Sequence, residues 1–340
     1  MSLRSFVTRW WAGEAGAAGR ALDALLLPAE WAFRGGVALR NRAFDAGLVR
    51  AARVDVPVLS VGNVGVGGAG KTPFAAWLAA RLREWGRRPA IALRGYGQDE
   101  VMLHRELNPE VPVFAAARRV EAARQAVRAG CDAVVLDDAF QHRRLARDAD
   151  LVLLSVEAWE RSPRLLPRGP WREGPGALAR ADAVVLTRKT AGAERARQVA
   201  AEVARRVPGK PVAVCRLAPG LLAALHGGGA RPVEALAGAR VLAVAALAAP
   251  GLFFDNLRAC GAEVEGAAYP DHHHFSAGEA REIQARAAGR TILMTHKDAV
   301  KLRSLLPPSA DALVLEQAVG FDSGLAELDA VLRRALEGRG

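Results

Sequence analysis

A glycine-rich segment, GVGGAGKT, occupies residues 65–72 and fits the pattern G-x-x-x-x-G-K-[ST]. In such a segment the glycines let backbone N–H groups curl around phosphate oxygens. The Lys71 ammonium would contact the β- and γ-phosphates, and the Thr72 hydroxyl could ligate Mg²⁺. The segment therefore predicts a site for a nucleoside triphosphate. The residues predicted to line it are Gly65, Val66, Gly67, Gly68, Ala69, Gly70, Lys71 and Thr72.

The residues on either side of this segment predict the elements that a phosphate site needs. An apolar, β-branched run at 56–61 predicts a strand before the loop. Phe74, Leu78 and Leu82 have the spacing of an amphipathic helix after it, whose amino end would present the positive end of its dipole to the phosphates. This order of strand, loop and helix favours a nucleotide site over a plain glycine-rich turn.

Two adjacent carboxylates, Asp137 and Asp138, follow a second apolar strand predicted at 131–136. A carboxylate at the end of a strand can hold the Mg²⁺ that bridges the β- and γ-phosphates. Such a pair is also common in turns and helix caps, but the phosphate-binding pattern upstream favours the metal role. Residues 139–141 lack the glycine of a GTPase D-x-x-G switch and no N-K-x-D guanine motif follows, so we do not expect a switch GTPase.

Three further polar segments follow predicted strands. RGYGQDE at 94–100 is predicted to be a loop. Three adjacent histidines in YPDHHHFS at 269–276 invite a metal hypothesis, but consecutive side chains point in different directions and seldom all bind one ion. One imidazole could instead orient a carboxylate base or accept a proton, and a solvated loop is the alternative. THKD at 295–298 could contact a nucleotide or cap the following helix.

Strand and helix signals alternate along the chain, which predicts an α/β fold with a parallel sheet covered by helices on both faces. In such a sheet, ligands bind at the carboxyl ends of the strands, where the polar segments lie. We predict an N-terminal helical segment at 1–50, a P-loop core at 51–219 and a smaller C-terminal α/β lobe at 220–340, divided near the Gly-Gly-Gly run at 227–229. The remaining predicted strands are 88–94, 111–114, 151–155, 183–187, 240–246, 262–268 and 291–295, and the remaining predicted helices are 118–129, 251–259 and 325–336.

The 340-residue chain has the hydrophobic content of a globular protein and a net charge of +11, almost wholly from arginine. This charge suits an anionic partner such as nucleic acid, acidic lipid headgroups or a phosphorylated substrate, although solvated arginine-rich faces explain it equally well. Cys131, Cys215 and Cys260 are far apart, which favours neither a zinc knuckle nor a disulfide framework and is typical of a reducing compartment. We expect neither a membrane span nor a signal peptide.

Tryptophan, leucine and arginine are interleaved in residues 1–50. On a helix, tryptophan and arginine suit the membrane–water interface, because each side chain has an apolar body and a polar end. The alternative is a helix whose aromatic stripe packs on the following domain. We expect an interfacial helix that lies on the membrane surface, because the segment is too polar to cross. The residues concerned are Arg4, Arg9, Trp10, Trp11, Arg20, Leu22, Leu25, Leu26, Leu27, Trp31, Phe33, Arg34, Arg40 and Arg42.

Taken together, these segments resemble the tetraacyldisaccharide 4′-kinase family of lipid A biosynthesis. The matching motifs are SVGNVGVGGAGKTP at 60–73, RGYG at 94–97, DDAFQHRRLARD at 137–148, LLPRGPWRE at 165–173, PDHH at 270–273 and THKDAVK at 295–301. Several motifs in this order are far more specific than a phosphate loop alone. The resemblance implies a P-loop kinase that transfers the γ-phosphate of ATP to the 4′-hydroxyl of a tetraacylated glucosamine disaccharide 1-phosphate, at the cytoplasmic face of the bacterial inner membrane.

The resemblance also implies a catalytic pair: the aspartate of a G-D-E-P segment and the histidine of a P-D-H segment, which correspond to Asp99 and His272. Here the first segment reads QDEV at 98–101, and the stretch between RGYG and Asp99 is much shorter than in the family. The family's serine before RGYG is Leu93, and its D-D-G-F-Q-H is DDAFQH at 137–142, so the side chains offered to ligands are retained.

In the mechanism that this resemblance implies, Asp99 takes the proton from the attacking sugar hydroxyl and is oriented by His272 from the second lobe. Closure of the two lobes would then assemble the site. Lys71 would balance the charge that develops on ATP. The candidate Mg²⁺ ligands are Thr72, Asp138, Glu100 and Asp137, and the candidate substrate-binding residues are Arg94, Arg172, Glu173 and His142.

An enzyme acting on such a lipid must work at the membrane, because withdrawing acyl chains costs about 0.8 kcal/mol per CH₂. This strengthens the interfacial interpretation of residues 1–50. We expect a peripheral, monomeric enzyme with no nucleic-acid partner. The alternatives are a synthetase that uses ATP to activate a carboxylate and a nucleic-acid-stimulated ATPase, although we find no aromatic-and-basic stacking motif for the latter.

Overall fold

The computed structural model describes residues 3–95, 98–160, 163–247, 250–271 and 273–338, and the chain divides into two structural units. Unit 1 comprises Met1–Arg94, Val111–Arg216 and Phe321–Gly340. Unit 2 comprises Gly95–Glu110 and Leu217–Gly320. The chain therefore leaves unit 1 twice and returns to it twice.

Unit 1 is built on a parallel sheet with the strand order β7-β6-β5-β1-β4-β2-β3. Its strands are β1 (Val58–Asn63), β2 (Pro89–Arg94), β3 (Val113–Ala116), β4 (Ala133–Leu136), β5 (Ala149–Ser155), β6 (Ala183–Arg188) and the first part of β7 (Val212–Ala224). The central strands are runs of buried valine, leucine and alanine, as expected for a parallel sheet covered on both faces. The helices α4 (Lys71–Glu84), α6 (Arg119–Arg128), α7 (Ala193–Arg206) and α11 (Leu325–Glu337) pack against it. The predicted P-loop-type α/β fold is confirmed.

The strand order brings two sequence motifs to one place. β1 lies between β4 and β5, and Val58 of β1 is paired in parallel with Val134 of β4. The loops that follow β1 and β4 therefore leave the same edge of the sheet next to each other. The glycine-rich segment follows β1 and Asp137 follows β4, so this edge is where the predicted nucleotide site belongs.

Unit 2 contains parallel strands in the order β10-β9-β11-β12. The elements are β9 (Arg240–Ala245), β10 (Glu263–Ala268), β11 (Thr291–Thr295), β12 (Ala312–Ser323), a short β8 (Ala230–Arg231) antiparallel to the end of β7, and the helices α5 (Gln98–Leu107), α8 (Pro250–Ala259), α9 (Ala277–Ala287) and α10 (His296–Leu302). Val244 and Met294 belong to one apolar cluster, and their neighbours Ala243 and Leu293 belong to another. Both faces of this sheet are therefore buried.

Two parts of the chain belong to the other unit from the one predicted. Helix α5 is inserted between β2 and β3 but belongs to unit 2, where Glu106 lies 3.0 Å from Arg303, just beyond α10. Helix α11 ends the chain but belongs to unit 1, where Asp329 lies 2.7 Å from Arg81 of α4. The predicted boundary between residues 219 and 220 therefore places both helices in the wrong unit, because it groups each helix with its neighbours in sequence.

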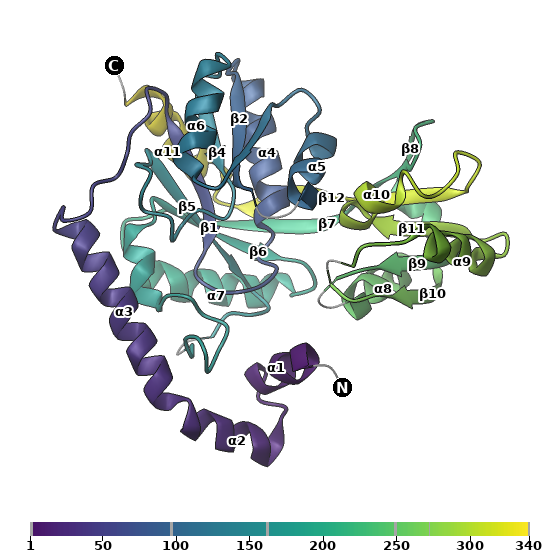
Figure 1. Ribbon diagram of the computed structural model, residues 1–340, viewed down its shortest axis with the longest axis horizontal. Coiled ribbons are helices and arrows are strands. Elements are labelled where there is room, and N and C mark those ends of the chain that lie inside the picture. The colour runs from purple at the N-terminus through teal and green to yellow at the C-terminus, as the bar shows by residue number, and fades with distance from the viewer. Residues whose placement is uncertain (1–2, 96–97, 161–162, 248–249, 272, 339–340) are drawn as a thin grey trace. The chain divides into compact units, whose positions relative to one another are not determined.

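The N-terminal part of unit 1 consists of α1 (Leu3–Trp11), α2 (Gly16–Leu25) and α3 (Leu27–Asp45), drawn in purple in Figure 1. Trp10 is buried, and its indole N–H donates to the Gly19 carbonyl at 3.1 Å and to the Asp23 carboxylate at 3.2 Å. The indole N–H of Trp11 donates to the Pro167 carbonyl at 3.1 Å. Trp10 therefore holds α1 to α2, and the interfacial role expected of it is wrong. None of the helices in the described residues has both the length and the hydropathy needed to cross a membrane.

A buried carboxylate attaches α3 to the rest of unit 1. Glu30 accepts hydrogen bonds from the Leu165 N–H at 3.0 Å and from the Arg168 guanidinium at 2.7 Å. Burial by itself would raise the pKa of Glu30, but these two donors and Arg34 outweigh it and lower the pKa. The N-terminal helices are thus docked through an ionised carboxylate onto the segment that carries the motif LLPRGPWRE.

Candidate active site

The glycine-rich loop has the backbone geometry that its sequence predicts. It connects β1 to α4, which begins at Lys71. Gly67 and Gly70 have φ angles of 118° and 75°, in the left-handed region that glycine adopts without steric cost. The Val66 N–H donates to the Pro170 carbonyl at 2.6 Å, so the loop is also held by the motif at 165–173. The predicted order of strand, loop and helix is confirmed.

Lys71, predicted to contact the phosphates, and Asp138, predicted to hold Mg²⁺, lie next to each other in the structure. The Lys71 ammonium lies 3.4 Å from the Asp138 carboxylate, and the Arg172 guanidinium lies 3.3 Å from the same carboxylate. The Asp138 side chain is 37% exposed, so it remains accessible between these two cations. Asp137, in contrast, is buried. Residues far apart in sequence thus form one charged cluster at the end of the loop.

Asp138 has an uncommon backbone conformation for a residue with a side chain, with a φ of 50°. Such a conformation costs on the order of 1–3 kcal/mol and persists only where the surroundings hold it. Arg119 supplies that support, because its guanidinium donates to the carbonyls of Asp137 and Asp138 at 3.2 and 2.7 Å. Arg119 lies in the first turn of α6 with no motif around it, so no sequence pattern indicates this role.

The turn that follows Asp138 packs directly on β1. A side chain at Gly62 would come within 2.5 Å of Phe140, so only glycine fits there. The Gln141 side-chain amide donates to the Asn63 carbonyl at 2.7 Å. Burial lowers the pKa of His142 to about 4, with further lowering by nearby arginines, the largest contribution among them from Arg119. His142 is therefore neutral at neutral pH.

Glu173 does not have the surroundings expected of a substrate-binding residue. It is 1% exposed and accepts hydrogen bonds from the Asn41 amide at 2.8 Å and the Arg180 guanidinium at 3.0 Å. The Arg40 guanidinium lies 3.3 Å away. Since Asn41 and Arg40 belong to α3, this carboxylate fastens α3 to the core, and we do not include it in the proposed substrate site.

In unit 2, the predicted loop at 94–100 is wrong at its end, because α5 begins at Gln98 and places Asp99 and Glu100 in its first turn. The Asp99 carboxylate lies 3.0 Å from the Lys301 ammonium of α10. The Lys301 side chain is only 9% exposed. Lys301 is the last residue of the THKDAVK motif, but no sequence pattern indicates that it pairs with Asp99.

The expected arrangement of the catalytic pair on two different lobes is not what the structure shows for Asp99. Asp99 belongs to unit 2, and so do Asp271 and His273, which flank position 272 in the sequence. His272 itself lies outside the described residues. A separation of Asp99 from the PDHH segment by lobe is therefore wrong, because α5 packs on α10 and belongs with it to unit 2.

The histidine next to position 272 has a structural role. The His273 ring stacks on Tyr269 with ring centroids 5.2 Å apart, and its Nε2 lies 2.8 Å from Glu279. Glu279 in turn forms a capping box with Ser276 at the start of α9. Among the described residues, no group of three or more histidine, cysteine, aspartate or glutamate side chains is arranged to hold a metal ion.

The THKD segment makes contacts within unit 2. Asp298 is fully buried and accepts hydrogen bonds from the Ala246 N–H at 3.1 Å and the Thr295 hydroxyl at 2.7 Å. Burial raises the pKa of Asp298, although these donors partly offset it. This carboxylate ties the turn between β11 and α10 to the end of β9.

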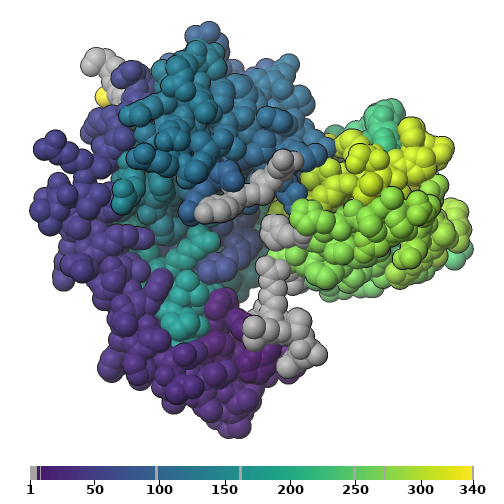
Figure 2. Space-filling view, viewed as in Figure 1, coloured from purple at the N-terminus to yellow at the C-terminus, as the bar shows by residue number. Residues whose placement is uncertain are grey.

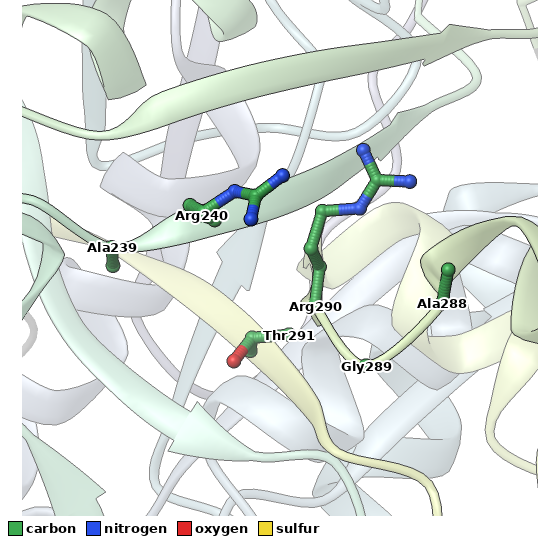
Figure 3. A pocket seen from close by; sticks show the side chains of 6 residues that line it. All are labelled: Ala239, Arg240, Ala288, Gly289, Arg290 and Thr291. Atoms are coloured by element: carbon green, nitrogen blue, oxygen red, sulfur yellow. The ribbon is translucent and has the colours of Figure 1, made fainter.

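Unit 2 also contains an open cavity of about 530 Å³, shown in Figure 3. It lies where β9 and β11 begin, at the amino ends of the strands and away from the polar motifs at their carboxyl ends. Arg290 forms an ion pair with Glu265, and Arg240 lies 3.7 Å from Glu263. Both arginines that line the cavity are therefore already paired with carboxylates. Its lining residues are Ala239, Arg240, Ala288, Gly289, Arg290 and Thr291.

Comparisons with known proteins agree on one family. The family model described as Tetraacyldisaccharide-1-P 4'-kinase matches residues 22–101 and 97–337. The chain is 43% identical to the tetraacyldisaccharide 4'-kinase of Anaeromyxobacter dehalogenans strain 2CP-C, over 88% of this chain and 87% of that protein. It is 37% identical to that of Aromatoleum aromaticum, over 93% and 94% of the two chains.

A solved structure is similar over almost the same length. The crystal structure of LpxK from Aquifex aeolicus in complex with ATP superposes with a TM-score of 0.75 and 27% sequence identity. The similarity covers 93% of this chain and 99% of that one. The motifs, the fold and these matches agree, and the chain belongs to the tetraacyldisaccharide-1-P 4'-kinase family.

Proposed function

We propose that this protein transfers the γ-phosphate of ATP to the 4′-hydroxyl of a tetraacylated glucosamine disaccharide 1-phosphate, forming the 4′-phosphate of the lipid A precursor. Family membership supports the reaction and the acceptor. The single observation that carries the phosphate-transfer chemistry is the cluster of Lys71, Asp138 and Arg172 at the end of the glycine-rich loop. Cations and an accessible carboxylate at that position are what a metal-bound triphosphate requires.

In this proposal the backbone amides of the loop and the Lys71 ammonium bind the phosphates of ATP. The Thr72 hydroxyl and the Asp138 carboxylate would hold Mg²⁺. These oxygen ligands suit the ion, because Thr72 is in the first turn of α4 and the Asp138 carboxylate lies 3.4 Å from Lys71, the residue before it. We favour Asp138 over Asp137, since Asp137 is buried. When bound, the ion would reduce the negative charge of the β- and γ-phosphates. Arg172 would help to position the phosphate.

We propose Asp99 as the base that takes the proton from the acceptor hydroxyl, with His272 as its orienting partner. Support for the placement of Asp99 comes from its ion pair with Lys301, which holds the carboxylate in one orientation at the start of α5. Its neighbour Glu100 stays a candidate metal ligand. Arg94 ends β2 at the carboxyl edge of the sheet and remains a candidate for substrate binding.

We further propose that the N-terminal helices lie on the cytoplasmic surface of the inner membrane, and that the enzyme is a monomer. Large apolar side chains are exposed on α2 and α3, namely Leu25 (72%), Trp31 (66%) and Leu39 (71%), and Leu48 (80%) is exposed just after α3. The helices that bear them form an outer part of unit 1, drawn in purple in Figure 2. An exposed apolar set beside several arginines favours the headgroup region of a membrane.

A phosphate-transfer assay tests the proposal directly. The purified full-length protein is incubated with radiolabelled ATP, Mg²⁺ and the tetraacylated disaccharide 1-phosphate in mixed micelles, with a polynucleotide in a parallel reaction. We expect label on the lipid, none of it after removal of divalent cations with EDTA, and no stimulation of ATP hydrolysis by the polynucleotide. Failure to label the lipid, or hydrolysis that depends on the polynucleotide, would overturn the proposal and favour the ATPase alternative.

A further inference from the structure

The turn that follows β6 lies against the glycine-rich loop of unit 1. The Thr187 hydroxyl is buried and donates to the Ala69 carbonyl at 3.0 Å. Two residues later, the Lys189 ammonium donates to the Gly68 carbonyl at 3.1 Å. Two consecutive carbonyls of the loop are therefore held by two side chains, Thr187 near the end of β6 and Lys189 in the turn that follows it. Neither side chain belongs to the phosphate-binding pattern.

This turn is itself organised by a carboxylate. One oxygen of Glu157 accepts hydrogen bonds from three consecutive N–H groups, those of Lys189 (2.7 Å), Thr190 (3.0 Å) and Ala191 (3.1 Å), and the other accepts from the Ser155 hydroxyl at 2.7 Å. Burial by itself would raise the pKa of Glu157, but these hydrogen bonds lower it to about 2. Glu157 is thus a permanent anion that keeps the Lys189 backbone in place.

We propose that Lys189 and Thr187 are positioning residues for the nucleotide: they hold the loop in the conformation that binds phosphate. This inference rests on the proposal that residues 65–72 bind ATP. The carbonyl and the N–H of a trans peptide point in opposite directions, so fixing a carbonyl also fixes the direction of the next amide. Since Thr187 donates to the Ala69 carbonyl, the Gly70 N–H points away from Thr187.

The composition of the loop explains why such support matters. Gly67 and Gly70 have positive φ angles, and glycines lose more conformational freedom on ordering than other residues do. A loop that is disordered without ligand must be ordered at the expense of binding energy. Lys189 also fixes the peptide between Gly68 and Ala69, whose N–H donates to the Gly67 carbonyl at 3.0 Å. The contacts of Thr187 and Lys189 with the loop should therefore increase nucleotide affinity without taking part in the chemistry.

The test measures the Kd of ATP and of ADP by calorimetry on the full-length protein, without a lipid acceptor, together with kcat and the KM values in the lipid assay. For Lys189→Met we expect the Kd of both nucleotides and the KM for ATP to rise about tenfold, the size of a lost charged hydrogen bond. We expect kcat and the KM for the lipid to stay within about twofold, because the reacting groups are untouched. Lys189→Arg, which can still donate to the Gly68 carbonyl, should restore most of the affinity.

Arg197→Met is the matched control, because it removes a cation of unit 1 that pairs with Glu194 on the exposed side of α7. Its nucleotide affinities should equal those of the unchanged protein. If Lys189→Met binds ATP normally, or if Lys189→Arg is as weak as Lys189→Met, the inference is wrong. Lys71→Ala tests the phosphate site on which this inference rests: normal ATP binding in that variant would show that residues 65–72 are not the phosphate site. If the unchanged protein binds ATP but does not phosphorylate the lipid, only the proposed reaction is wrong.

Discussion

The Asp99 carboxylate lies 3.0 Å from the Lys301 ammonium, and both residues belong to unit 2. A second ion pair joins Glu106, near the end of α5, to Arg303, just beyond α10, with the guanidinium 3.0 Å from the carboxylate. Helix α5 is thus held at both ends by residues of the THKDAVK region. The proposed base consequently belongs to the unit that also contains the PDHH segment, although it follows a strand of the P-loop core in sequence.

Replacing Lys301 should impair the chemical step. In Lys301→Met the Asp99 carboxylate loses its partner, and we expect kcat to fall about 10- to 100-fold, less than the 10²- to 10⁴-fold typical for loss of a positioned base. The KM for ATP should stay unchanged, because the glycine-rich loop, where we propose that the phosphates bind, is in unit 1. Steady-state kinetics on the lipid substrate measure both constants.

Two further variants show whether Lys301 does more than attach α5. Lys301→Arg should recover most of kcat, since it keeps a cation at Asp99. Arg303→Met breaks the other ion pair of α5 and should lower thermal stability while leaving kcat near normal. Normal turnover in Lys301→Met would remove this residue from the mechanism.

Glu173 should matter for stability and not for substrate binding. Its removal leaves Arg180 and Arg40 without their shared carboxylate in a buried site, and we expect Glu173→Ala to lower the free energy of unfolding by about 3 kcal/mol. Chemical denaturation measures this change. Glu194→Ala, which disrupts an ion pair on the surface of α7, should have little effect. A raised KM for the lipid with unchanged stability would instead restore Glu173 to the substrate site.

The membrane proposal is best tested by point substitutions. Deleting the N-terminal helices would also remove Glu30, which holds residues 165 and 168, and so would confound membrane binding with folding. Trp31→Ser with Leu39→Ser removes two exposed apolar side chains. Burying one such side chain contributes about 1.5 kcal/mol or more to the free energy of binding, so loss of both should weaken binding to phospholipid vesicles by about a hundredfold.

Vesicle sedimentation measures this binding, and activity should fall on vesicle-borne lipid more than on lipid in detergent micelles. Leu221→Ser is the control, because Leu221 is an exposed leucine of unit 2 outside the N-terminal helices. Equal vesicle binding by the double variant and the unchanged protein would show that these side chains do not contact the membrane.

His142 should make the protein less stable at mildly acidic pH. Its pKa in the folded protein is about 4, below the usual value of 6.5, so the unfolded chain binds the proton more readily. Stability is therefore lost progressively as the pH falls from about 6.5 towards 4. Urea unfolding at several pH values should show this loss, and His142→Gln should flatten it. An unchanged pH dependence in His142→Gln would assign the acid sensitivity to other groups.

The geometry of the glycine-rich loop, and its approach to the aspartates after β4, could be predicted because their signals are local. The glycines of residues 65–72 and the aspartates after an apolar strand specify their own backbone environment, and parallel pairing of β1 with β4 brings them together. The contacts of the other candidates depend on partners far away in sequence. Glu173 looks like a polar residue in a motif, and only the neighbouring Asn41 and Arg40 of α3 make it a structural anchor.

In the N-terminal helices, too, the environment of a side chain could not be predicted from the residues next to it. Their composition predicts amphipathic helices near a membrane, but composition does not decide which tryptophan is buried. Trp10 is buried because Gly19 and Asp23 of α2 offer acceptors to its N–H, whereas Trp31 is exposed on α3.

The family, the α/β fold and the geometry of the glycine-rich loop follow from the amino-acid sequence, since each depends on short motifs and periodic burial in neighbouring residues. The membership of Asp99 in unit 2, its pairing with Lys301 and the contact of Lys189 with the glycine-rich loop emerge only in three dimensions. The physical reason is that an ion pair or a hydrogen bond depends on distance in space, and more than a hundred residues separate the partners in each of these contacts.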